Sequence, residues 1–289
     1  MAHAGCQPFL FLLWHVIHPT DGGGRQARLA HAGRKYVQSP QYCGRIHSVE
    51  SLQSKEIPPE SDNIGLRSAP GEHAGPRVLE VRDCGLADYR EILHVQQQLC
   101  DQRREGRIPD TVLILEHPPV ITLGAHQSRN RLLATREHLG REGIDIVSIR
   151  RGGGATAHNP GQVVFYPILN LEQLKLGISQ YVRRLETIGA ALLAGLGVNS
   201  VPRKGLPGLW VGEKKIASIG VRVSKMTTCH GMAINIQNDL SIFDLIVPCG
   251  LEDVRMTSVL DETGHRHQMG QVKESLAQLL REHFATGKP

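Results

Sequence analysis

From residue 76 onward, short apolar segments alternate with turns that contain glycine or proline and with a few longer amphipathic stretches. Residues 112–115 and 120–123 have the length and β-branched content of buried strands. Residues 179–196 instead place apolar side chains on one face at helical spacing, and further helices are expected near 89–100 and 272–284. Runs of strands between a few helices predict an α+β fold, a mixed sheet with flanking helices, and not a regular βαβ repeat.

Residues 1–75 have a different character. They are rich in His, Gly, Ser and Pro and have no sustained period, as in the glycine run 22–24 and the Pro58-Pro59 pair. Such a composition is typical of chain that cannot bury enough apolar surface to fold. The sequence therefore predicts a disordered N-terminal extension over 1–75 and one catalytic domain over 76–289.

The overall composition excludes several classes of function. The net charge is +5 without a dense basic run and aromatic residues make up only 4%, so a nucleic-acid platform is not expected. No apolar run reaches the roughly 18 residues that span a bilayer, so no membrane association is expected. The six cysteines are scattered without a C-x-x-C pair, a pattern that fits neither a zinc site nor a disulfide scaffold. We therefore expect no metal and a reducing, intracellular location.

A glycine-rich segment runs from Arg151 to Gln162. Consecutive glycines let backbone N–H groups approach a ligand closely, because no β-carbon intervenes. The spacing matches neither a Walker A loop nor a dinucleotide fingerprint. Taken alone, the glycines favour a glycine-rich connection between strands over a binding loop.

Two side chains further along can carry nucleophilic and proton-transfer chemistry. Lys215 begins an otherwise apolar segment, so its amine can lie near a cleft, although a solvated lysine beside a turn is the commoner case. Cys249 lies between Pro248 and Gly250, which presents a sulfur on a sharp turn and makes the Gly250 N–H a candidate oxyanion donor. A lone cysteine is more often inert. Cys229 and His230 are neighbours on an expected strand and point to opposite faces, so Cys229 is interpreted as structural.

Together and in this order, these motifs resemble the octanoyl-[acyl-carrier protein]–protein N-octanoyltransferases of lipoate biosynthesis, over about residues 78–260. The motifs are His117-Pro118, Arg151-Gly152-Gly153, His158-x-Pro160-Gly161-Gln162 with Tyr166-Pro167, Gly208-Leu209-Trp210-Val211, Lys215-Ile216-Ala217-Ser218-Ile219-Gly220, His230-Gly231-x-Ala233-x-Asn235, Phe243-x-x-Ile246-Val247-Pro248-Cys249-Gly250 and Thr257-Ser258.

The resemblance implies the fold of biotin and lipoate protein ligases and a two-step acyl transfer. Cys249 attacks the thioester of octanoyl-acyl carrier protein, and Lys215 stabilises the thiolate and moves protons. A lysine of a lipoyl domain then takes the octanoyl group, the acceptors being 2-oxoacid dehydrogenase complexes and the glycine cleavage H protein. No cofactor is implied, and the location is cytoplasmic, or mitochondrial if the source is eukaryotic. The implied substrate-contacting residues are Arg151, Gly152, Gly153, Gly154, Ala155, Thr156, Ala157, His158, Ser218, Ile219, Gly220, Gly231, Met232 and Ala233.

Two positions depart from the family's pattern. Ala157 stands where an aromatic residue is usual, a change that can widen the acyl slot. Asn159 stands where glycine is usual, which costs energy if the backbone there needs a positive φ. Two alternative functions also remain open: an ATP-dependent lipoate or biotin protein ligase, and a non-catalytic protein that binds an acyl group or its carrier. The Pro248-Cys249-Gly250 turn favours the transferase over the first, and the presence of both Lys215 and Cys249 favours it over the second.

Overall fold

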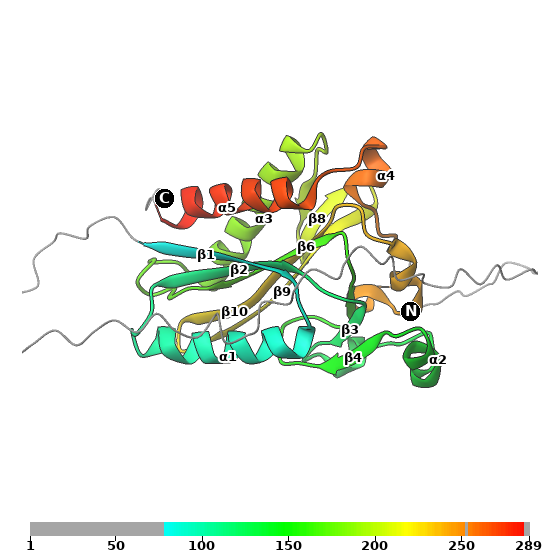
Figure 1. The fold of residues 1–289 in the computed structure, drawn as a ribbon, viewed down its shortest axis with the longest axis horizontal. Helices are drawn as coiled ribbons and strands as arrows, with labels where there is room; N and C mark the ends of the chain where they lie inside the picture. Colours follow the sequence, from blue (N-terminus) through cyan, green and yellow to red (C-terminus); the bar gives the residue numbers. More distant parts are fainter. Residues whose placement is uncertain (1–77, 252–253, 286–289) are drawn as a thin grey trace, which may run out of the picture. The chain divides into compact units, whose positions relative to one another are not determined.

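The computed structural model describes residues 78–251 and 254–285. The predicted extension over 1–75 lies outside these residues. Seven strands form the main sheet in the order β1-β2-β6-β10-β9-β8-β7 (Figure 1). Only β1 and β2 are parallel, and all other neighbours are antiparallel, so the sheet is mixed as predicted. Their bounds are β1 Leu79–Leu86, β2 Asp110–Glu116, β6 Gln162–Ile168, β7 Val201–Arg203, β8 Leu206–Val211, β9 Lys214–Ser224 and β10 Thr227–Asn235.

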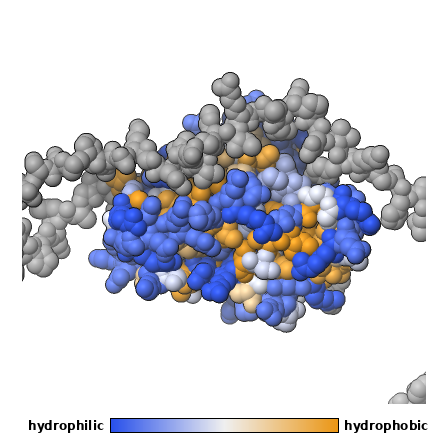
Figure 2. All heavy atoms as spheres, turned by 60° about the horizontal axis from the view of Figure 1, so that its bottom comes forward, coloured by the Kyte–Doolittle hydropathy of each residue, from blue (hydrophilic) through white to orange (hydrophobic). Residues whose placement is uncertain are grey.

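Helices cover both faces of this sheet. The helices α3 (Ile178–Gly195) and α5 (Met269–Phe284) pack on one face, where apolar residues of both helices and of the strands form the larger core. The helix α1 (Tyr89–Arg104) packs on the other face, with Ile92, Val95 and Leu99 directed at the strands. The side of the molecule that includes α1 is largely hydrophilic outside, with apolar side chains visible between the polar ones (Figure 2).

A second, three-stranded sheet has the order β4-β3-β5 and carries part of the glycine-rich segment. Its strands are β3 Val120–Leu123, β4 Asp145–Ser148 and β5 Thr156–His158, and the short helix α2 covers Arg136–Arg141. Three further short elements are η3 (Gln127–Arg129), η4 (Leu240–Leu245) and η5 (Pro248–Gly250), and α4 covers Val259–Thr263. The sequence pattern did not indicate β5, β7 or α2, because each is too short to show a period.

A tight hairpin joins β8 to β9: Val211 pairs with Lys214, and Gly212 has a φ of 52° in the loop. No helix within the described ranges is both long and apolar enough to cross a membrane.

Candidate active site

Arg151 holds the glycine-rich loop from within. Its side chain is only 7% exposed. One guanidinium nitrogen donates to the carbonyl oxygens of Gly154 and Gly152, at 2.8 and 3.0 Å. The other donates to the carbonyl oxygen and the hydroxyl of Thr122, at 3.0 and 2.7 Å. The guanidinium therefore fixes the loop against β3, a scaffolding role that its place in the motif did not reveal.

Two facing glycines allow close backbone approaches here, Gly220 to this loop and Gly231 to the neighbouring strand β6. Gly220 of β9 pairs with Gly231 of β10. A β-carbon on Gly220 would lie 2.7 Å from Cδ of Arg151, and one on Gly231 would lie 2.1 Å from the carbonyl oxygen of Phe165. The Gly152 N–H donates to the Val221 carbonyl oxygen at 2.9 Å across this contact. A larger residue at Gly220 would push the loop away from the sheet, whereas one at Gly231 would collide with the neighbouring strand β6.

A narrow pocket lies between the loop, the two glycines and α1. Its free volume is about 30 Å³, room for about one or two water molecules, so an acyl chain can enter only if side chains move. The lining residues are Tyr89, Arg151, Gly153, Thr156, His158, Val164, Tyr166, Ser218, Ile219, Gly220, His230, Gly231, Met232 and Ala233.

Ten of the substrate-contacting residues expected from the resemblance therefore line one pocket. Gly152, Gly154, Ala155 and Ala157 are not among its lining residues. Tyr89 and Val164 line it but were not proposed from the sequence, because an aromatic residue near a helix start and a valine in a strand are ordinary core residues.

The histidine and tyrosine side chains of this pocket are buried and uncharged at neutral pH. Burial lowers the pKa of His158 to about 3 and that of His230 to about 4, and it raises the pKa of Tyr89 to about 12. Next to them, burial lowers the pKa of His117 to about 4. His117 Nδ1 lies 2.8 Å from the Ala87 carbonyl oxygen, to which it can only donate, so its Nε2 accepts from the Tyr166 hydroxyl at 2.9 Å.

Lys215 is a buried residue of β9, not a solvated lysine beside a turn. Its side chain is 2% exposed, and its ammonium nitrogen lies 5.3 Å from the centroid of the Trp210 ring. Its backbone N–H donates to the Arg255 carbonyl oxygen at 2.8 Å, and its carbonyl oxygen accepts from the Thr257 N–H at 2.9 Å. These bonds attach Lys215 to the segment that follows the Cys249 turn in the chain.

The turn around Cys249 is a short 3₁₀ element, η5, which begins with Pro248 and ends with Gly250 at a φ of 67°. The Gly250 N–H donates to the Val247 carbonyl oxygen at 3.1 Å. This bond corrects the expectation that the Gly250 N–H serves as an oxyanion donor, because the turn itself already uses that hydrogen.

Arg129, which the sequence did not single out, connects this turn to the glycine-rich loop. A β-carbon on Gly250 would lie 2.6 Å from Cβ of Arg129, and one on Gly154 would lie 2.3 Å from its carbonyl oxygen and 2.5 Å from its Cβ. The Ala155 N–H also donates to the Arg129 carbonyl oxygen, at 3.2 Å. The stem of Arg129 thus lies between Gly154 and Gly250 and sets their separation.

The two departures from the family pattern lie beside η4. Ala157 is fully buried in an apolar cluster with Ile242 and Phe243, on the other side of β5 from Thr156 and His158. Asn159 has no positive φ, so the strain considered for it does not arise. Its side chain donates to the Asp239 carbonyl oxygen at 2.8 Å and accepts from Asn238 at 3.1 Å. Asn159 therefore ties the β5–β6 turn to the start of η4.

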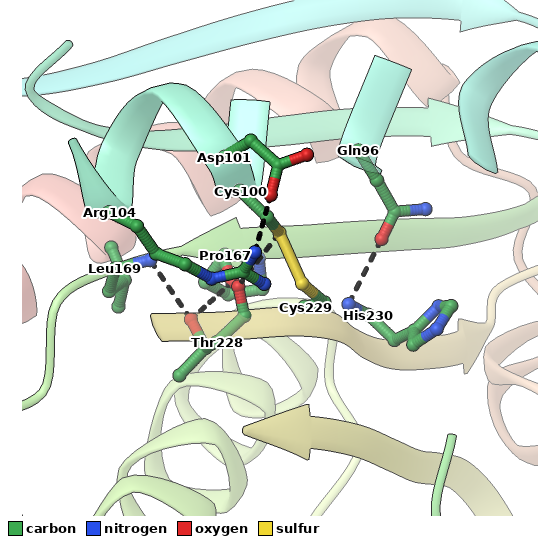
Figure 3. The surroundings of a disulfide bond; sticks show 9 residues. All are labelled: Gln96, Cys100, Asp101, Arg104, Pro167, Leu169, Thr228, Cys229 and His230. Atoms are coloured by element: carbon green, nitrogen blue, oxygen red, sulfur yellow. Dashed lines mark hydrogen bonds and ion pairs between the residues drawn. A yellow bond between two sulfur atoms is a disulfide. The ribbon is translucent and has the colours of Figure 1, made fainter. Parts of the chain in front are cut away.

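Cys229 is structural, and its partner is Cys100. A disulfide joins Cys100 of α1 to Cys229 of β10 across a sequence separation of 129 residues (Figure 3). The scattered spacing of the cysteines, which fits no disulfide scaffold, could not indicate this single pairing. One turn earlier in α1, the Gln96 side-chain oxygen accepts from the His230 N–H at 3.0 Å. His230 has a φ of 59°, and this bond holds its unusual backbone beside the pocket.

Comparisons with known proteins agree with this architecture. Residues 88–281 match the lipoyl protein ligase A/B catalytic domain family. An octanoyltransferase from Roseiflexus sp. (strain RS-1) is 44% identical over 203 residues, which cover 69% of this chain and 85% of that protein. An octanoyltransferase from Chloroflexus aurantiacus is 42% identical over 212 residues, which cover 72% of this chain and 95% of that protein.

Solved structures share the fold at low sequence identity. A lipoate-protein ligase A bound with ATP has a TM-score of 0.56 and 17% identity, covering 72% of this chain and 85% of that one. A bi-partite lipoate protein ligase from Thermoplasma acidophilum has a TM-score of 0.53 and 17% identity, covering 73% and 84%. The predicted α+β, lipoate-ligase-like fold is thereby confirmed. By its family match and its octanoyltransferase relatives, the chain belongs to the lipoyl protein ligase A/B catalytic domain family and is an acyltransferase.

Proposed function

We propose that this protein transfers an octanoyl group from octanoyl-acyl carrier protein to a lysine of a lipoyl domain, with Cys249 as the nucleophile. The buried Lys215 carries the proposal. Its backbone is hydrogen-bonded to residues 255 and 257, directly after the Cys249 turn, and a buried lysine with no chemical task is costly to keep.

The first step exchanges one thioester for another. The Cys249 thiolate attacks the carbonyl carbon of the octanoyl thioester, the carbon–sulfur bond to the carrier's pantetheine breaks, and the leaving thiolate receives a proton from Lys215. The product is octanoyl-Cys249. Because the bond broken and the bond formed are of one kind, the step needs no energy source.

The second step forms the amide. The neutral amine of the acceptor lysine attacks the carbonyl carbon of octanoyl-Cys249, and the electron pair of the broken carbon–sulfur bond returns to sulfur. The proton that leaves the nitrogen passes to Lys215, which restores the starting state for the next cycle. The pocket lined by Gly220, Gly231 and Ala233 holds the acyl chain during both steps.

Intact-protein mass spectrometry tests the proposal. The protein is mixed with octanoyl-acyl carrier protein without ATP, together with Cys249→Ser and Cys84→Ser variants. Cys84 is a matched control because it is a free cysteine, and burial raises the pKa of its thiol to about 11. We expect one octanoyl adduct on the wild type and on Cys84→Ser, none as a thioester on Cys249→Ser, and loss of the adduct when a lipoyl domain is added.

Two other outcomes would contradict the proposal. Transfer that needs ATP and free octanoate, without an adduct, would establish a ligase. Tight binding of the octanoyl carrier without adduct or transfer under either condition would establish a binding protein.

A further inference from the structure

Two buried amide side chains connect the pocket to the segment that holds Lys215. Asn235 donates from Nδ2 to the Thr257 carbonyl oxygen at 2.9 Å, and Thr257 in turn donates its N–H to the Lys215 carbonyl oxygen. A carbonyl oxygen can only accept, so the orientation of the Asn235 amide is fixed. Its Oδ1 therefore accepts from Gln162 Nε2, at 2.9 Å.

The orientation of Gln162 follows from the same reasoning. Its Nε2 donates to Asn235 and also to the Ala157 carbonyl oxygen at 3.3 Å. The atom that faces His158 is consequently Oε1, which lies 2.6 Å from His158 Nδ1. Gln162 and Asn235 are both at most 2% exposed, so water does not compete for these bonds.

This network selects one tautomer of His158. Because Gln162 Oε1 only accepts, Nδ1 of His158 carries the hydrogen. Burial lowers the pKa of this imidazole to about 3, so the ring is neutral at physiological pH and Nε2 has a free lone pair. Among residues 78–251 and 254–285, no side chain or backbone group forms a hydrogen bond with Nε2. The ring lines the pocket, and the Tyr89 ring stacks on it with 5.8 Å between the ring centroids.

The lone pair of Nε2 can accept a hydrogen from a reacting group that enters the pocket. An acyl chain and a thioester carbonyl donate no hydrogen, whereas the acceptor amine does. Strand β5, which ends at His158, contacts η5, which contains Cys249. We propose that His158 Nε2 accepts a hydrogen bond from the attacking amine in the second step, and that Gln162 is the positioning residue that fixes the required tautomer.

This inference rests on the proposed function and adds a catalytic residue to it. The bonds made and broken are those of the amide-forming step: the nitrogen–carbon bond forms, the carbon–sulfur bond breaks, and the amine's proton passes to Lys215. His158 takes no proton. It holds one N–H of the amine so that the nitrogen lone pair points at the carbonyl carbon of octanoyl-Cys249.

The tautomer is tested first, without any activity measurement. Two-bond ¹H–¹⁵N spectra of the full-length, ¹⁵N-histidine-labelled protein at neutral pH distinguish Nδ1–H from Nε2–H, and His158→Asn identifies the signal. We expect Nδ1–H for His158 in the wild type. Gln162→Met should populate Nε2–H, whereas Gln162→Glu, whose buried carboxyl is protonated, should retain Nδ1–H because it keeps an accepting oxygen. A wild-type ring protonated on Nε2 would overturn the inference.

The two half-reactions are then measured separately, with Gln97→Met as control, an exposed glutamine on α1. We expect Gln162→Met to slow the discharge of octanoyl-enzyme by a lipoyl domain by about 10- to 100-fold, the range of one lost catalytic hydrogen bond, with thioester formation nearly unchanged. Gln162→Glu should recover most of the rate. Equal discharge by wild type and Gln162→Met, or an equal loss in both half-reactions, would contradict the role of His158.

The failure of the proposed function has a different signature. If the wild type forms no octanoyl-enzyme, the thioester mechanism is wrong. The proposed hydrogen bond from the attacking amine to His158 is then wrong too, whichever tautomer of His158 the spectra show. If Gln162→Met does not fold, the wild-type spectrum and the Gln162→Glu rates still decide.

Discussion

The ammonium nitrogen of Lys215 lies 5.3 Å from the centroid of the Trp210 indole ring, in a part of the sheet where both side chains are almost fully buried. A cation at this distance from an aromatic face is attracted by the ring's quadrupole. Arg203 lies over the same ring, at 4.7 Å. Trp210 thus orients the amine that the proposed mechanism needs.

Replacing Trp210 tests this contact. A desolvated cation–π contact contributes up to about 2 kcal/mol, so Trp210→Leu should lower kcat for transfer by about 10- to 30-fold beyond any effect on stability. Trp210→Phe keeps a ring and should recover part of the loss. The measurement is kcat and KM at temperatures well below the Tm of each variant. Equal rates for Trp210→Phe and Trp210→Leu would show that the ring acts only as packing.

Lys215 and Lys214 form a matched pair for mutation. Lys215 is buried, whereas the Lys214 side chain is 45% exposed and forms an ion pair with Glu262. Lys215→Met should reduce octanoyl transfer by at least about 100-fold, the usual contribution of a positioned proton-transfer group. Lys214→Met removes only a surface ion pair and should change the rate by no more than about two-fold. Mass spectrometry of thioester formation compares the Lys215→Met and Lys214→Met variants. A comparable loss of rate in both would argue against a chemical role for Lys215.

The stem of Arg129 makes two glycines sensitive to substitution. Gly154→Ala and Gly250→Ala both place a β-carbon against Arg129, and Gly250 also has a positive φ. Each should lower the unfolding free energy by about 1–3 kcal/mol or shift the loop and the turn apart. Gly140→Ala in α2 meets no atom within 4 Å and is the control, since alanine favours the helix by up to about 1 kcal/mol. Urea unfolding and thioester formation rates are the readouts, and an unaffected Gly154→Ala protein would mean that the contact is loose.

Stability should fall as the pH is lowered. The pKa values of His117, His158 and His230 are depressed by burial in the folded protein to about 4, about 3 and about 4, against 6.5 for an ordinary histidine. Below pH 6.5 the unfolded chain therefore binds more protons than the folded one, and each group removes up to about 1.4 kcal/mol of stability per pH unit until its folded pKa is reached. Urea unfolding at pH 7.5, 6 and 5 measures the slope. His117→Asn should reduce it, and an unchanged slope would contradict this origin.

The Cys100–Cys229 disulfide should stabilise the oxidised protein. It closes a loop of 129 residues between α1 and β10, and loops of this length correspond to about 2–5 kcal/mol of unfolding free energy. Cys100→Ser should therefore unfold at lower urea than the oxidised wild type, and a reductant should remove most of the difference. Mass spectrometry after alkylation under denaturing, non-reducing conditions counts the free thiols. If wild type remains more stable than Cys100→Ser in reductant, the stabilisation comes from packing of the Cys100 sulfur and not from the disulfide.

The sequence alone determined the larger helices and the buried strand β2, because the apolar patterns of α1, α3, α5 and β2 are long enough to be recognised. It also determined the family, through motifs whose spacing is fixed by the chain. The short elements β5, β7 and α2 carry no such period. The division into two sheets was not visible either, because pairing between distant strands depends on the register of the whole fold.

Only the tertiary structure decided how the site residues relate to each other. Lys214 and Lys215 are neighbours in sequence. They differ in burial because β8 and residues 255–257 enclose Lys215 in the folded protein. Arg129 contacts Gly154 and Gly250, which are far from it in sequence. Trp210 contacts Lys215 because β8 pairs with β9 in the sheet. The tautomer of His158 depends on two amides whose orientation is fixed by backbone carbonyls of β5 and of residue 257. Hydrogen bonding and burial are properties of positions in space, which the order of residues specifies only through the completed fold.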